Sequence, residues 1–492
     1  MYPYKNDHMY DVIVIGQDLS SLVAALASVR QGLRTILIAE GGINRGHCVG
    51  GYSFPVDLAP LSGLGEEQTI RRLLTELTFS SADAPSFVSQ DPAFQVILSG
   101  HRVDLFQDRE RLITELIREF PLESEAIQRF YETIAKSESL VARWITEDIS
   151  RQPQDIHQVL QKLLRVPAAL SGSFSLWRRF NECSGALRRI LEAQIATLSH
   201  LDFSGSAFPL TAAYLLSLPG RGVSYPVGGR SAMLSWLLKR FTDAGGTFRD
   251  DCSVMRVETK PEIEVALEYA GEPIGFMAKK LIVCAQWEKL NLLLFQEKNF
   301  RRYARRMSSF PPCGFPFCLQ LGVHEEALPE RLAPYAVVVR DETKPAAGMN
   351  ILFLETSLPG EVERAPAGRR AINAKIFLDD SPLLLADADL KEVAKMIMDS
   401  LEGPIPFLRD SIDYLNIDKS IAISRQYQEI VNHKYGSRKH SLTGLKTLSP
   451  QTPLPDVILT GGLFRAGLGF EGEILSGMDS AFLAGKNIHG SG

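Results

Sequence analysis

Short runs of consecutive apolar residues mark the hydrophobic pattern at the start of this chain. Residues 11–15 form one run, which ends at Gly16, and residues 34–40 form another, which ends in an acid. A strand without polar alternation is buried on both faces, as in a parallel sheet. Between the two runs, residues 19–30 carry closely spaced small side chains, which predicts a helix packed on that sheet. Strand, turn, helix, strand and acid within about 30 residues predict a βαβ unit.

Helical periodicity replaces this pattern further along the chain. Charged residues alternate with apolar stripes at residues 109–120, 124–148 and 155–164. Such stripes predict amphipathic helices that pack on other elements through one face. We expect the charges to form the solvated faces of these helices.

Strand-like patterns return in the second half of the chain. The buried runs at 280–285 and 457–462 resemble the first strand, and the second of them again leads into glycine. Residues 247–257 predict one further strand, followed by a hairpin through Gly271. The remaining predicted elements are strands at 336–339 and 375–378 and helices at 231–244, 388–401 and 473–484.

The length of 492 residues predicts two or three domains, since one domain typically holds about 100–200 residues. We expect an α/β fold with a dinucleotide-binding domain that is discontinuous in sequence and an inserted α+β substrate domain. The first domain is predicted to comprise residues 1–65, 215–290 and 445–492. The second is predicted to comprise residues 66–214 and 291–444, with a helical part and a mixed sheet.

Composition excludes several classes of protein. Hydrophobic residues are 45% and charged residues 23%, and the formal net charge is −5, so nothing indicates a nucleic-acid partner. The six cysteines show neither CxxC nor zinc spacing, so we expect reduced thiols, no metal site and a cytoplasmic location. No apolar run approaches the ~20 residues that cross a bilayer. Peripheral contact with a membrane stays open.

Four blocks carry a resemblance to a known family. They are residues 11–40, residues 51–60 (GYSFPVDLAP), residues 225–257, which begin YPVGG, and residues 459–484. In this order they resemble the phytoene desaturase branch of the amine oxidase-like flavoproteins. The resemblance implies a Rossmann-like FAD/NAD(P)-binding domain, bound FAD and a small hydrophobic substrate.

The turn after the first strand departs from the family's G-x-G-x-x-G pattern. There the glycines make a tight turn, let the backbone approach the pyrophosphate and allow close packing of the helix on the strand. Gly16 keeps the first position and the small Ser21 takes the third, but Asp18 puts a carboxylate where phosphates should approach. Asp is also a preferred N-cap. We therefore favour an Asp18 that accepts hydrogen bonds from the amides of Ser20 or Ser21.

Glu40 and Arg45 are further candidates for contact with the cofactor. Glu40 ends the second strand, where the family's acid binds the adenosine ribose, although a solvated strand end is the alternative. Arg45 follows the pair Gly41-Gly42 too late to match the family's Gly-Gly-Arg, so a plain loop arginine is the preferred interpretation.

The closing block is altered as well. The family's Gly-Asp pair is replaced by Gly461-Gly462, so a carboxylate that faces the ribitol and pyrophosphate is missing. Arg465 either serves a phosphate or is a surface arginine. The remaining glycines of the candidate site permit close backbone approach to a ring or shape a turn, and they are Gly228, Gly229, Gly469 and Gly472.

No catalytic residue can be assigned from the sequence. The histidines, among them His200, are isolated, and ordinary polar or core roles are expected for them. Flavin chemistry does not require such residues, because the cofactor performs the hydride transfer and the protein orients the substrate.

Two functions from different classes remain. The first is an FAD-dependent oxidoreductase that passes hydride from a hydrophobic, isoprenoid- or carotenoid-like substrate to flavin. The second is a flavin-free member that binds a lipid or protein, in the manner of the Rab GDP-dissociation inhibitors. Asp18 and Gly462 favour the second, whereas Glu40 and the glycine-rich closing block favour the first. The balance of these residues favours the enzyme.

Overall fold

The computed structural model describes most of the chain. The described residues are 9–43, 46–58, 60–65, 68–78, 84–136, 178–202, 209–217, 222–287, 289–290, 298–428, 431–436 and 448–489. Arg45, the predicted helix at 155–164 and residues 137–148 of the predicted helix at 124–148 lie outside them.

The first sheet contains the predicted βαβ unit. It consists of β1 (Met9–Ile15), α1 (Leu19–Arg30) and β2 (Thr35–Ile38). β1 pairs in parallel with β2 on one side and with β13 (Glu272–Cys284) on the other. β20 (Val457–Thr460) extends the parallel part beside β13. β2 and β20 are entirely buried, as their unbroken apolar runs predict, and β13 is buried along its last five residues.

Within the described residues, seven strands form this sheet in the order β10–β2–β1–β13–β12–β11, with β20 beside β13. The other strands are β10 (Thr247–Arg249), β11 (Cys252–Glu258) and β12 (Ile263–Tyr269). The single strand predicted at 247–257 is wrong. The chain bends at Asp250 and Asp251, so β10 pairs with β2 while β11 pairs with β12. The predicted hairpin through Gly271 is confirmed.

The second sheet joins the two long insertions. Eight strands of the described chain form it in the order β18–β14–β17–β16–β15–β7–β8, with β19 beside β14. They are β7 (Phe94–Ile97), β8 (Arg102–Leu105), β14 (Pro312–His324), β15 (Tyr335–Val339), β16 (Ile351–Thr356), β17 (Arg369–Leu378), β18 (Ile412–Leu415) and β19 (Lys434–Tyr435). β7 comes from the first insertion and pairs in parallel with β15 from the second. The smaller sheets contain β3 (His47–Val49), β4 (Tyr52–Phe54), β5 (Leu61–Ser62), β6 (Phe87–Ser89) and β9 (Val223–Pro226).

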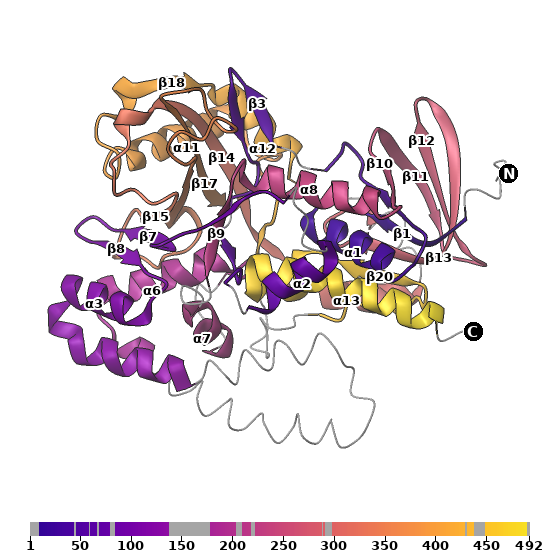
Figure 1. The fold of residues 1–492 in the computed structure, drawn as a ribbon, viewed down its shortest axis with the longest axis horizontal. Helices are drawn as coiled ribbons and strands as arrows, with labels where there is room; N and C mark the ends of the chain where they lie inside the picture. Colours follow the sequence, from indigo (N-terminus) through magenta and orange to yellow (C-terminus); the bar gives the residue numbers. More distant parts are fainter. Residues whose placement is uncertain are drawn as a thin grey trace.

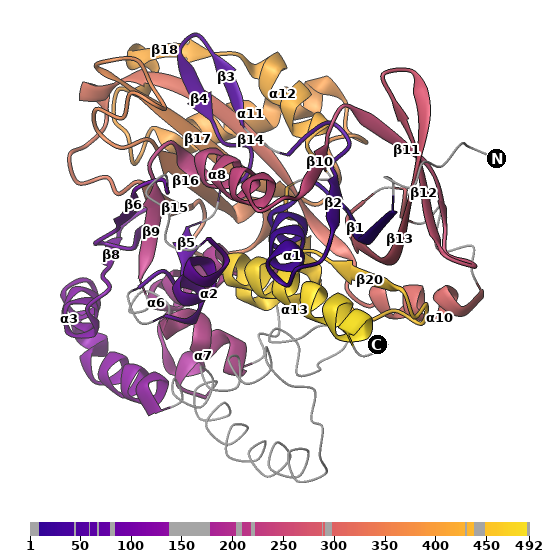
Figure 2. The ribbon, with the colours of Figure 1, turned by 45° about the vertical axis from the view of Figure 1, so that its right-hand side comes forward.

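Helices cover both sheets (Figure 1). They are α2 (Thr69–Thr78), α3 (Arg109–Glu119), α6 (Gly185–Leu198), α7 (Pro209–Ser217), α8 (Gly229–Asp243), α10 (Lys298–Met307), α11 (Asp387–Leu401), α12 (Ile417–Gln426) and α13 (Gly469–His489). Figure 2 shows α1 lying beside α13 and near α8. α13 begins four residues before the predicted 473–484 because it includes the glycine-rich entry. Among the described helices, none has the length and apolar character to cross a membrane.

The expected α/β fold with a Rossmann-like dinucleotide-binding unit is confirmed. The domain boundaries remain a prediction. The elements that the sequence places at a dinucleotide site, namely the β1–α1 turn, the end of β2 and the start of α13, converge on one region of the first sheet.

The contact between α1 and α13 depends on a glycine. A Cβ at Gly477 would lie 2.5 Å from the carbonyl oxygen of Ser20 and 2.8 Å from Cβ of Val23. Both obstacles are backbone or a β-branched side chain of α1, so the two helices would have to separate.

We therefore expect Gly477→Ala to lower the free energy of unfolding by about 1–3 kcal/mol, the usual cost of overpacking. Urea denaturation measures this change. Gly403→Ala is the matched control, because a Cβ at Gly403 meets nothing within 4 Å. Equal stability of the two variants would show that α1 and α13 tolerate a wider separation.

Candidate functional site

Asp18 caps α1 from within the protein. Its Oδ1 accepts hydrogen bonds from the backbone N–H of Ser21, at 3.0 Å, and from the Ser21 hydroxyl. The side chain is 4% exposed, and Ser20 and Ser21 are fully buried. The predicted N-cap is thus confirmed, and the carboxylate occupies the position in which a helix N-terminus would otherwise receive an anion.

The electrostatics of this turn oppose a further anion. Burial raises the pKa of the Asp18 carboxyl, although the hydrogen bonds from Ser21 act in the opposite direction, and the nearby charge of Glu473 raises it further. At Gly16, an added Cβ would lie 2.1 Å from the Ser21 hydroxyl oxygen and 2.8 Å from Cβ of Cys284. Ser21 therefore fills the space that a glycine at the third position of the pattern would leave open.

Glu40 accepts hydrogen bonds from four donors of this chain. Its Oε1 accepts from the backbone N–H of Val254 at 2.7 Å and from the ammonium of Lys289 at 2.5 Å. Its Oε2 accepts from the indole N–H of Trp287 at 2.6 Å. The hydroxyl of Ser253 adds a fourth contact at 3.2 Å. Glu40 is therefore not a solvated strand end, because four donors of the chain already contact its carboxylate.

The glycines of the closing block approach protein atoms. A Cβ at Gly462 would lie 2.4 Å from the side-chain oxygen of Asn432, and one at Gly469 would lie 2.3 Å from the carbonyl oxygen of Leu198. A Cβ at Gly472 would lie 2.2 Å from the carbonyl oxygen of Arg465. Gly461 is also buried, and its N–H donates to Ser476. These glycines allow the closing block to pack on the rest of the chain.

Arg465 is not the surface arginine that one interpretation expected. It is 1% exposed, and its Nε and Nη2 lie 3.0 and 2.7 Å from Oδ2 of Asp479. The guanidinium is therefore held by a carboxylate of the same closing block. A role on a phosphate would require this ion pair to open.

Gly228 and Gly229 serve the turn before α8. Gly228 has φ +83° and its N–H donates to Oε1 of Glu361 at 2.7 Å. Gly229 has φ +72°, and a Cβ there would lie 3.1 Å from Nη1 of the fully buried Arg364. Arg364 in turn donates to Glu355 and to the hydroxyl of Tyr225. The packing role of this glycine pair is thus the one that the geometry supports.

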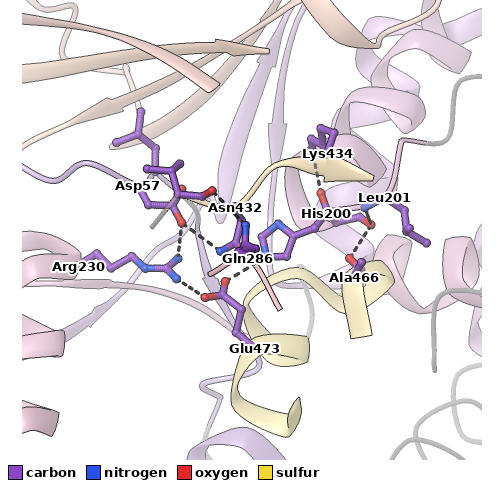
Figure 3. Close-up of polar contacts among 12 residues, drawn as sticks. Asp57, His200, Leu201, Arg230, Gln286, Asn432, Lys434, Ala466 and Glu473 are labelled. Carbon is purple, nitrogen blue, oxygen red and sulfur yellow. Dashed lines mark hydrogen bonds and ion pairs between the residues drawn. The ribbon is translucent and has the colours of Figure 1, made fainter. Parts of the chain in front are cut away.

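A cluster of buried charges lies beside the closing block (Figure 3). Arg230 of α8 donates to Glu473 of α13 at 2.5 Å and lies 3.5 Å from Asp57. Lys375 of β17 donates to the other oxygen of Asp57 at 3.1 Å. His200 Nε2 lies 3.0 Å from the second oxygen of Glu473. We call these five residues the charge cluster, and each is at most 8% exposed.

Opposite charges balance each other within the charge cluster. Burial alone would raise the pKa of Asp57, but the cations Lys375 and Arg230 hold it well below its usual range. Burial alone would lower the pKa of Arg230, and the carboxylates of Glu473 and Asp57 keep it raised. The carboxylate of Asp57 and the guanidinium of Arg230 are therefore both charged. Buried groups keep their charge when an opposite charge is paired and hydrogen-bonded with them.

The charge cluster was not predicted from the sequence. Asp57 and Arg230 lie inside the quoted blocks 51–60 and 225–257, yet neither was singled out. His200 was treated as an isolated histidine. The residue in the sequence that could have indicated this cluster is Glu473, a carboxylate among the small residues at the start of the closing helix. Such a charge, if buried, requires a cation from elsewhere in the fold.

A cavity of about 290 Å³ lies next to the charge cluster, between α6 and the second sheet. Its apolar wall includes Phe353 of β16 and Phe377 of β17. The charged groups on its wall are Arg188, Arg189, Glu192, Asp202 and Lys434. Residues of both insertions line the cavity.

Comparisons with known proteins identify the fold. No protein-family model matches the sequence, and no curated protein matches it. An oxidoreductase from Methanosarcina mazei has a similar structure, with a TM-score of 0.63 and 12% identity over 95% of this chain and 99% of that one. Putrescine oxidase bound to putrescine gives a TM-score of 0.59 with 15% identity over 96% and 98% of the two chains. A Rab GDI from Plasmodium falciparum gives 0.54 with 11% identity over 98% of each chain.

These likenesses confirm the expected resemblance at the level of the fold. This chain thus has a fold that it shares with the Methanosarcina mazei oxidoreductase, with putrescine oxidase and with the Rab GDI. Identities of 11–15% do not carry an activity from those proteins to this chain.

The residues present do not fit FAD. Its pyrophosphate would need the N-terminus of α1, where the buried Asp18 carboxylate already caps the helix. The negative charges of Asp18 and Glu473 lie close enough together for one to raise the pKa of the other. The acid expected to bind ribose is occupied by four donors of the chain. Asp18 and Glu40, the side chains expected near the pyrophosphate and the ribose, thus already have partners from this chain.

The shifted pKa of Asp18 leads to a stability prediction. Because the folded-state pKa lies above that of the unfolded chain, about 3.9, the folded state holds a proton that the unfolded state has released. Stability therefore falls as pH rises through this window. Asp18→Asn keeps an acceptor for the cap and removes the charge. We expect the Asp18→Asn variant to be more stable than the parent at pH 7 by on the order of 1 kcal/mol, with the gap closing near pH 4.

Urea denaturation at both pH values measures this difference. Asp18→Ala is the control for the cap, since it removes both charge and acceptor and should cost about 1 kcal/mol relative to Asp18→Asn. If Asp18→Asn is no more stable than the parent at pH 7, the carboxylate is not under electrostatic strain.

Proposed function

We propose that this chain is a flavin-free binding protein, which holds an apolar small molecule in the cavity between α6 and the second sheet. One observation carries the proposal. Residues of the chain itself engage the two acids expected at a dinucleotide site: Ser21 donates to Asp18 and Val254 donates to Glu40, with Asp18 4% exposed and Glu473 fully buried. A protein that uses FAD would keep this region accessible to the cofactor.

The character of the cavity supports an apolar occupant. Ligand pockets are typically about 300–1,000 Å³ and mostly apolar, with a few polar groups that fix orientation. This cavity, of about 290 Å³, lies at the lower end of that range, and Phe353, Phe377, Ile351 and Ile195 contribute to its wall. A medium-sized apolar molecule suits both the volume and the lining.

The likeness to a Rab GDI supports the class of function. That protein is a GDP-dissociation inhibitor with the same fold along nearly the whole chain. We infer that this architecture can serve binding without redox chemistry. A peripheral contact with a membrane would give such a protein access to an apolar ligand.

The second candidate is an FAD-dependent oxidoreductase that acts on a hydrophobic substrate by hydride transfer to flavin. The fold likeness to putrescine oxidase and to the Methanosarcina mazei oxidoreductase favours it. It would require Asp18, Glu40 and Glu473 to give up their present partners. We therefore rank it below the flavin-free function.

The flavin content distinguishes the two candidates. We expect the freshly purified protein to be colourless, to release no FAD on denaturation, and to bind added FAD no more tightly than about 0.1 mM in calorimetry. The physical reason is that the buried carboxylates of Asp18 and Glu473 repel the phosphates and that Glu40 already has partners from the chain. Visible flavin absorbance bands, or binding of FAD with micromolar affinity, would contradict the flavin-free function and favour the oxidoreductase function.

Filling the cavity should abolish ligand binding. Ala347 lines the cavity and is half-buried, so Ala347→Trp places an indole in it. We expect the affinity for Nile red, an uncharged apolar dye, to fall at least about tenfold, measured by fluorescence titration. Ala367→Trp is the matched control, because Ala367 is exposed and does not line the cavity. Equal dye binding by both variants would place the binding site elsewhere.

A further inference from the structure

Lys434 brings an amine to the wall of the cavity. It lies on the short strand β19, which pairs with the start of β14 at Gly314. Its Nζ donates to the carbonyl oxygen of Ala196 at 2.5 Å and to that of Ser199. Both carbonyls belong to the C-terminal end of α6, so the amine is held in place on the helical side of the cavity.

The surroundings of this amine are aromatic and cationic. Nζ of Lys434 lies 5.0 Å from the ring centre of Phe377 and 5.6 Å from that of Phe353. Nζ of Lys375 lies 5.2 and 5.9 Å from the same two rings. Burial and the charge of Lys375 lower the pKa of Lys434 to about 7, and Asp202, Cys313 and Asp57 oppose that shift only in part.

A lysine in this state is a nucleophile at neutral pH. An amine with a pKa of about 7 is about half uncharged at pH 7, whereas an exposed lysine with a pKa of ~10.4 is about 0.04% uncharged. An uncharged amine has two N–H bonds, and both can be donated to Ala196 and Ser199. Its lone pair then remains for a carbon electrophile. Desolvation beside a second cation is an established way to activate lysine.

We propose that Lys434 is a carbonyl-reactive amine that holds an apolar aldehyde in the cavity as an imine. This inference rests on the proposed function, because it names the class of ligand. The nitrogen lone pair forms a bond to the carbonyl carbon, and a proton passes from nitrogen to oxygen. Loss of the hydroxyl as water, with a second proton, leaves the C=N bond. The step needs no oxidant or reductant, and Asp202 on the same wall can carry the protons.

The other charges of the cavity argue against a carboxylate ligand. Arg188 lies 3.2 Å from Glu192, and Arg189 is paired with the same carboxylate. Glu192 also accepts from the backbone N–H of Ala346 at 3.0 Å. The arginines are thus engaged with the protein itself. The remaining amine is half uncharged, which suits an aldehyde better than a permanent anion.

Reductive trapping tests the imine in the full-length protein. Decanal is added with sodium cyanoborohydride at pH 7, and the product is located by peptide mass spectrometry. We expect one decyl group per chain, on Lys434, at a level at least about tenfold above any other lysine. Lys434→Arg should lose this product because a guanidinium does not form the imine. Lys239→Arg is the matched control, since Lys239 is exposed, and it should leave the product unchanged.

Binding of decanol separates this inference from the proposed function. Decanol does not react with an amine, and we expect it to displace Nile red from the cavity of the parent protein. If Lys434→Arg does not fold, Lys434→Met takes its place. Decanol binding without a product on Lys434, or with products spread evenly over exposed lysines, overturns the imine and leaves the binding function standing. Failure of decanol and dye to bind the parent protein overturns both.

Discussion

The chain of ion pairs that runs from Lys375 through Asp57 and Arg230 to Glu473 links four separate segments of the structure. β17 belongs to the second sheet, Asp57 follows β4, and α8 and α13 cover the first sheet. Removing one member would leave its partner buried and uncompensated, which costs about 3–5 kcal/mol. The relative position of the two sheets depends on all four charges being present.

The same ion pairs show where the buried charges of this region find their partners. Here the carboxylate of Glu473 meets Arg230 and His200, so the protein completes its own interior. Two other groups of the region are also bound by residues of this chain. The N–H of Gly228 donates to Glu361, and the buried Arg465 donates to Asp479. A shared architecture therefore fixes where a ligand could lie, but not which one.

The sequence predicted the local features of the site well. α1 was predicted with the bounds that the structure has, and Asp18 was predicted as its cap, because an N-cap depends only on residues within one turn. The predicted strand at 247–257 failed because strand pairing, not composition, separates β10 from β11. The partners of Glu40 could not be predicted either. Trp287 and Lys289 lie more than two hundred residues further along the chain, and no local pattern connects them to β2.

The large sequence separations within the charge cluster have a consequence for the order of folding. Asp57 and Lys375 are 318 residues apart, and Arg230 and Glu473 are 243 residues apart. Contacts of such separation form late, after the loops between them have been closed. During synthesis, Arg230 emerges from the ribosome long before Glu473 exists to neutralise it. The region around Arg230 on α8 must therefore remain open and hydrated until α13 is synthesised, so that docking of this last helix completes the interior of the protein.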